Sequence, residues 1–211
     1  MSVTQPAQRA GRRTRLTVSA ALVVANVAIV GVFVHQLLAS SSPVASPSST
    51  ASPSGTRHKA IGEADGVVPQ GVTVFDDDIP AVANLDPDLL GALRKAATDA
   101  EDNGVRFFVN SGWRSPAYQE QLLREAVAKY GSKEEAARWV ATPDTSPHVA
   151  GNAVDIGRSD ATAWLSKHGA KYGLCQIYKN EPWHYELRPE AIDHGCPPMY
   201  ADPTHDPRMQ Q

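Results

Sequence analysis

The sequence contains little cysteine and no strong excess of charge of either sign, and each shortage removes a class of protein. Two cysteines, Cys175 and Cys196, are too few for a disulfide-rich scaffold or a four-cysteine zinc site. The formal net charge is -3, from 20 Lys and Arg residues against 23 Asp and Glu residues. No basic stripe stands out beyond the N-terminus, so the sequence gives no reason to expect nucleic-acid binding.

The N-terminal part of the chain contains one long apolar run, LTVSAALVVANVAIVGVFV, behind an arginine-rich stretch at residues 1–15. About 20 apolar residues are needed to cross the hydrocarbon core of a membrane. We therefore expect a single transmembrane anchor over residues 16–38, with residues 1–15 in the cytoplasm, because positive charge stays on that side. A cleaved signal peptide, which would leave a secreted protein, is the alternative. No cysteine comes directly after the run, which excludes a lipoprotein anchor.

The rest of the chain divides by composition into a linker, a domain and a tail. Residues 39–60 consist largely of Ser, Pro, Ala and Thr, and such a segment cannot bury enough apolar surface to fold, so we expect a flexible linker. Residues 61–200 then form a domain of ordinary size. Residues 201–211 are expected to be an irregular C-terminal tail.

Helix caps and apolar spacing predict both helices and strands within the domain. The clearest helix starts are Asp86 before Pro87 and Ser115 before Pro116, because Asp and Ser cap helix N-termini and Pro suits the first helical position. The predicted helices cover residues 87–103, 116–130, 133–140 and 159–168, and the predicted strands cover residues 105–110, 153–156, 174–178 and 183–187. Helices and strands do not alternate regularly, which favours an α+β fold with packed helices and a small antiparallel sheet.

Two short stretches contain the residue types of a metal site. In SPHVAGNAVD, small residues separate His148 from Asp155, so that the chain can turn sharply and pack close to a metal. A catalytic zinc site usually has three His or carboxylate ligands, which makes His148, Asp155 and His184 candidates. In EPWH, Glu181 precedes His184 by three positions and is a candidate general base. From the residues alone, a surface His–Asp pair and a turn that enters a strand stay open as alternatives.

Taken together, the two stretches resemble the zinc D-alanyl-D-alanine carboxypeptidases of the VanY type. The shared pattern is S-x-H-x-x-G-x-A-x-D at residues 146–155 followed by E-x-W-H at residues 181–184. An upstream SGWRS at residues 111–115, with Gln119 shortly after it, is similar to the substrate-binding element of that family. The resemblance covers residues 80–190 and implies a fold of the Hedgehog/DD-peptidase-like kind.

The resemblance also implies a role for each matching position. The implied ligands of one Zn2+ per chain are His148, Asp155 and His184. Glu181 would be the general base, and Arg114 would polarise the scissile carbonyl and steady the oxyanion. The implied pocket for a terminal D-alanine is lined by Ser115, Gln119 and Ser146.

The activity implied by the resemblance is removal of the terminal D-alanine from peptidoglycan stem peptides. The domain would act outside a bacterial cell membrane, to which the N-terminal helix would anchor it. Two other functions stay open: a D-Ala-D-Ala dipeptidase or stem-peptide endopeptidase of the same fold, and a non-catalytic cell-wall or metal-binding module. Glu181 argues against such a module, because a pure binding site needs no base. The sequence does not indicate an oligomeric state.

An extracytoplasmic location would also decide the state of the two cysteines. Disulfides persist in oxidising compartments, so Cys175 and Cys196 are candidates for one bridge that ties the C-terminal segment to the sheet. Two free buried thiols are the alternative.

Overall fold

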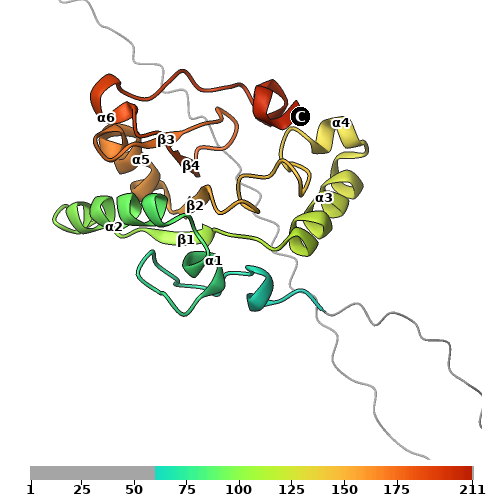
Figure 1. Ribbon diagram of the computed structural model, residues 1–211, viewed down its shortest axis with the longest axis horizontal. Coiled ribbons are helices and arrows are strands. Elements are labelled where there is room, and N and C mark those ends of the chain that lie inside the picture. Colours follow the sequence, from blue (N-terminus) through green and yellow to red (C-terminus); the bar gives the residue numbers. More distant parts are fainter. Residues whose placement is uncertain (1–59, 211) are drawn as a thin grey trace, which may run out of the picture. The chain divides into compact units, whose positions relative to one another are not determined.

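The structure is a computed structural model, and it describes residues 60–210 (Figure 1). In chain order its elements are η1 Glu63–Asp65, α1 Pro80–Ala83, α2 Pro87–Glu101, β1 Phe108–Ser111, α3 Pro116–Tyr130, α4 Lys133–Ala136, β2 Ala153–Gly157, α5 Ser159–His168, η2 Gly169–Tyr172, β3 Leu174–Gln176, β4 His184–Leu187, α6 Ala191–His194, η3 Pro203–His205 and η4 Pro207–Gln210. Within this part of the chain, no helix combines the length and apolar character needed to cross a bilayer. The predicted anchor, residues 16–38, and residues 39–59 of the predicted linker lie outside it.

Four antiparallel strands form a sheet in the order β1-β2-β4-β3 (Figure 1). Strand β2 pairs with β1 on one side and with β4 on the other, while β3 and β4 form a hairpin. Side chains alternate between the two faces of a strand. Val154, Ile156 and Tyr185 therefore point into the apolar core, and their neighbours Asp155 and His184 point to the opposite face. The predicted α+β fold with a small antiparallel sheet is confirmed.

Helices α2 and α5 supply the other half of the core. Leu89 and Leu93 of α2 and Leu165 of α5 are buried in the same apolar cluster as the sheet residues. Each buried leucine stabilises the fold by about 1.5–3 kcal/mol. Helix α2 begins where the sequence predicts, because the carboxylate of Asp86 accepts hydrogen bonds from the backbone amides of Asp88 and Leu89. The sheet is thus held rigidly from one side, which leaves its other face for a site.

Several element boundaries differ from the prediction, most of them by one or two residues, and the two largest differences have causes in the hydrogen bonding. Strand β1 begins at Phe108, not at residue 105, because its pairing with β2 begins with Phe108 opposite Gly157. Helix α4 ends at Ala136, not at residue 140, because three-residue bonds interrupt the α-helical pattern there: Arg138 donates to the carbonyl of Glu135 and Trp139 to the carbonyl of Ala136. Both boundaries depend on hydrogen bonds, which the spacing of apolar residues does not predict.

The C-terminal segment, residues 196–210, packs onto the domain and corrects the prediction of an irregular tail. It contains the two short turns η3 and η4, and the carboxylates of Asp202 and Asp206 are buried. Asp202 accepts a hydrogen bond from Arg138 at 3.1 Å, and Asp206 accepts one from the hydroxyl of Tyr178 at 3.0 Å. These partners explain why two acidic residues in a Pro-rich stretch leave water.

A disulfide between Cys175 and Cys196 joins strand β3 to the start of the C-terminal segment. Cys175 lies in a small buried cluster with Ile177, Tyr178 and Ala191. The bond therefore fixes the C-terminal segment to β3, which pairs with the strand that carries His184.

Candidate active site

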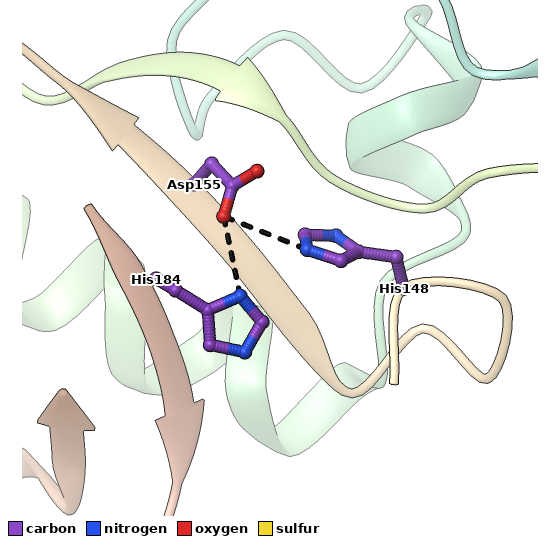
Figure 2. A group of neighbouring side chains, drawn as sticks. All are labelled: His148, Asp155 and His184. Atoms are coloured by element: carbon purple, nitrogen blue, oxygen red, sulfur yellow. Dashed lines mark hydrogen bonds and ion pairs between the residues drawn. The ribbon is translucent and has the colours of Figure 1, made fainter. Parts of the chain in front are cut away.

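Neighbouring strands bring two of the three candidate ligands together. Asp155 on β2 lies directly opposite His184 on β4, and directly opposed residues point to the same face of a sheet. The Nδ1 atom of His184 lies 3.3 Å from Oδ1 of Asp155. Figure 2 shows this carboxylate oxygen between the rings of His184 and His148.

The third candidate, His148, comes from the loop that precedes β2. Its Nε2 atom lies 3.5 Å from Oδ1 of Asp155 (Figure 2). Its Nδ1 atom lies 2.8 Å from the backbone carbonyl of Gly112. A carbonyl oxygen only accepts, so Nδ1 of the neutral ring carries the proton. The lone pair of Nε2 therefore faces Asp155 and His184, as a metal ligand requires.

Two glycines allow the loops of the site to approach helices α1 and α2. A side chain at Gly112 would place its Cβ 2.1 Å from the carbonyl oxygen of Ala81. Gly151 has a φ of +76°, and a Cβ there would lie 2.6 Å from the carbonyl of Asn84. Any larger residue would push these loops outward, and with them the carbonyl that orients His148.

The donor set fits a divalent metal ion. The ligand atoms of His148, Asp155 and His184 all lie within 4.8 Å of one another, and all three residues are buried. Burial lowers the pKa of His184, but hydrogen bonds to the carboxylates of Asp155 and Glu186 outweigh burial and raise it to about 9. Burial raises the pKa of Asp155, but the two histidines and Arg114 hold it well below its ordinary value. Asp155 therefore stays ionised, and two imidazoles with one carboxylate are ligands that zinc accepts.

Glu181 lies beside this donor set with one oxygen free. Its Oε2 atom lies 3.8 Å from Nδ1 of His184, and its buried Oε1 atom has no hydrogen-bond partner among the described residues. Burial raises the pKa of Glu181 from 4.5 to about 7. A carboxyl group with a pKa near neutrality can both accept and donate a proton at physiological pH.

Three hydrogen bonds hold Arg114 in place, one of them to the carboxylate of Asp155. Its guanidinium donates to Oδ2 of Asp155 at 3.1 Å, to Oε1 of Gln119 at 3.1 Å and to the hydroxyl of Ser111 at 2.8 Å. Gln119 is almost fully buried, and its own amide donates to the carbonyl of Ala141 at 2.9 Å. The positive charge of Arg114 is therefore fixed in place before any ligand arrives.

These residues open onto one cavity of about 260 Å³. Ser146 and Gln119 line it, together with the ligands, Glu181 and Arg114. Ser115 is not among its lining residues: its hydroxyl accepts from the amide of Tyr118 at the start of α3 and donates to Asp65 at 3.2 Å. The contact of Ser115 with a substrate stays a prediction.

Two groups of residues around the site were not predicted from the sequence. Trp139 and Met209 line the cavity, the second from the C-terminal segment. Glu186 accepts a hydrogen bond from His184, and its spacing of two residues along the same strand face could have indicated it. Arg208, which contacts Glu186, had no local signal in the sequence.

The arrangement as a whole is that of a buried metal site with an adjacent acid–base group and a fixed cation, the class of site used for metal-assisted hydrolysis. Residues 82–190 match the family model described as "VanY: D-alanyl-D-alanine carboxypeptidase". This stretch is just over half of the 211 residues, and the chain therefore belongs to the VanY family of D-alanyl-D-alanine carboxypeptidases.

The similar proteins include a D-alanyl-D-alanine carboxypeptidase of Enterococcus faecalis (strain ATCC 700802 / V583). It is 33% identical over 111 residues, with 41% of this chain and 41% of that protein covered. The chain thus spans less than half the length of this curated relative.

Three solved structures are also similar to the chain. The vancomycin-resistance D,D-pentapeptidase VanY in complex with Zn(II) is 30% identical with a TM-score of 0.46, over 49% of this chain and 72% of that one. VanYB in complex with D-alanine-D-alanine is 29% identical with a TM-score of 0.48, over 53% and 74%. The LD-carboxypeptidase LdcB is 25% identical with a TM-score of 0.48, over 60% and 70%.

Proposed function

We propose that this chain is a zinc-dependent D-alanyl-D-alanine carboxypeptidase that removes the terminal D-alanine from peptidoglycan stem peptides. Membership of the VanY family and the curated relative's name support the activity. The observation that carries the proposal is the convergence on one cavity of three buried donors, a fixed guanidinium and a carboxylate oxygen that has no partner among residues 60–210.

The residues that would hold one zinc ion are His148, Asp155 and His184. A zinc ion bound there supplies Lewis acidity, which polarises a carbonyl and lowers the pKa of water to about 7. The buried carboxylate of Asp155 would help to balance the positive charge of such an ion. One of its oxygens faces the two histidines, and the other accepts a hydrogen bond from Arg114.

Glu181 would move the proton during hydrolysis. Its unpartnered Oε1 atom can accept a proton from the attacking water, and the same group can then donate that proton to the leaving amine of D-alanine. The surrounding burial keeps the pKa of Glu181 at about 7, so that neither transfer is strongly uphill at neutral pH.

Arg114 would stabilise the negative charge that develops on the scissile carbonyl oxygen. Its guanidinium lines the cavity, and Gln119, Ser111 and Asp155 keep it from swinging away. A preorganised cation costs no reorganisation when the charge appears, which is why such groups contribute strongly to catalysis.

We also propose that the domain works outside the cytoplasm, anchored by the apolar segment at residues 16–38 or secreted after its removal. The disulfide between Cys175 and Cys196 supports this location, because such bonds persist in oxidising compartments. Stem peptides of the cell wall would share that compartment.

The proposed function is tested by mass spectrometry of the chain incubated with a stem pentapeptide that ends in D-Ala-D-Ala. Loss of one alanine, abolished by a chelator and restored by zinc, is the expected result. Glu181→Ala should abolish turnover and leave zinc content near one equivalent per chain, because Glu181 is not a ligand. Release of a dipeptide, an internal cut, or turnover that survives Glu181→Ala would refute the proposed reaction or its base.

A further inference from the structure

A buried carboxylate stands behind His184, on the side away from the proposed metal. Glu186 is 1% exposed, and its Oε1 atom lies 3.2 Å from Nε2 of His184. A histidine that binds a metal is neutral and gives up the proton of the ligand nitrogen. An ionised carboxylate can only accept, so Nε2 would keep its proton toward Glu186 in the metal-bound site. Nδ1, which lies 3.3 Å from Oδ1 of Asp155, would then offer its lone pair to the metal.

The carboxylate of Glu186 is itself held by two arginines. Arg188, from just beyond β4, donates to Oε2 at 2.7 Å. Arg208, from η4 in the C-terminal segment, donates to Oε2 at 2.6 Å and to Oε1 at 3.2 Å. Arg208 therefore donates hydrogen bonds to both oxygens of Glu186, including Oε1, which also accepts a hydrogen bond from His184. Arg188 donates only to Oε2.

Further contacts fix Arg208 in this position. Its Nε atom donates to both oxygens of the buried Asp206, at 3.1 and 3.0 Å. Asp206 also accepts the hydroxyl proton of Tyr178, whose ring centroid lies 5.1 Å from that of His184. The end of the chain is thus linked to one candidate ligand by an unbroken path of hydrogen bonds.

We propose that Glu186 and Arg208 are positioning residues for the metal centre: Arg208 orients the carboxylate of Glu186, which in turn fixes the tautomer and the ring orientation of His184. The inference rests on the proposed zinc site. Partners behind a metal-binding histidine typically change metal affinity by about 10- to 100-fold. Residue 208 lies beyond the stretch that matches the family, residues 82–190, so this control belongs to the C-terminal segment of this chain.

The test is the dissociation constant for Zn2+ of the full chain, measured by competition with a chromophoric chelator at fixed pH. Arg208→Ala should weaken zinc binding by roughly tenfold or more. Arg138→Ala is the matched control, because Arg138 anchors the same segment through Asp202 and does not contact Glu186. The control should bind zinc as the native chain does.

Arg208→Lys provides a second variant that keeps the charge but loses the two-pronged contact, and it should weaken zinc binding by a smaller factor. If Arg208→Ala does not fold, this variant decides. Native-like zinc affinity in Arg208→Ala, or in Arg208→Lys where only that variant folds, would overturn the inference. Equal weakening in Arg138→Ala would overturn it as well, because general loosening of the segment would then explain the loss.

The two proposals fail in different ways. A native chain that binds no zinc would contradict the proposed function. A native chain that binds zinc tightly, with unchanged affinity in the Arg208 variants, would contradict only the positioning role. Excess zinc should restore turnover to Arg208→Ala, which a collapsed site would not permit.

Discussion

Replacing Glu181 with glutamine should make the metal-free domain more stable at alkaline pH. Burial raises the pKa of Glu181 from 4.5 to about 7, which means that the folded protein holds this carboxylate in its charged form at a cost. Glutamine has nearly the same shape and no charge, so the substitution removes that cost. The proposed general base is thus expected to be a site where catalysis and stability oppose each other.

The size of the effect follows from the linkage between protonation and folding. Each pH unit between the folded and unfolded pKa values corresponds to about 1.4 kcal/mol. The unfolded chain releases the proton of Glu181 near pH 4.5, and the folded chain releases it near pH 7, so native stability falls between these values. The gain from Glu181→Gln should be below about 1 kcal/mol at pH 5 and should reach about 3 kcal/mol at pH 8.

Urea unfolding of residues 60–210 measures this gain after metal is removed with a chelator. Glu125→Gln, on the exposed side of α3, is the matched control for loss of a surface charge. A gain for Glu181→Gln that is the same at pH 5 and pH 8, or no gain at pH 8, would refute the reasoning.

Three further predictions concern the ligands, the pocket and the disulfide. Asp155→Ala should lower zinc content after dialysis to far below one equivalent by atomic absorption, and a retained equivalent would contradict its role as a ligand. Gln119→Ala should reduce kcat/KM by about tenfold, because it removes a hydrogen bond to a charged group at Arg114. An unchanged kcat/KM would argue against that support. Reduction of the bond between Cys175 and Cys196, which lie 21 residues apart, should lower unfolding free energy by about 3 kcal/mol. Identical urea curves with and without reductant would contradict it.

Local signals in the sequence predicted the helix starts well. Asp86 and Ser115 each cap the helix that follows them, because a cap depends only on residues within one turn. The start of β1 at Phe108 and the end of α4 at Ala136 were less accessible. They depend on a partner strand and on a change in hydrogen-bond spacing, neither of which leaves a local pattern.

The same distinction applies to the candidate site. The sequence motifs predicted the three candidate metal ligands that the structure brings together, because each ligand lies in a short stretch with a characteristic order of residue types. Ser115 shows the opposite case: its helix cap has a local signal, but the bond from its hydroxyl to Asp65, fifty residues away, has none. The link from Arg208 to Glu186 spans 22 residues between elements with no shared periodicity, so only the folded chain reveals it.

The most direct test of the account is an anomalous difference map, recorded at the zinc absorption edge, from crystals of the domain grown with zinc. We expect one strong peak within bonding distance of Nε2 of His148, the carboxylate of Asp155 and Nδ1 of His184. A peak at another place, or a map without a peak at these three atoms, would contradict the claim that they form a metal centre.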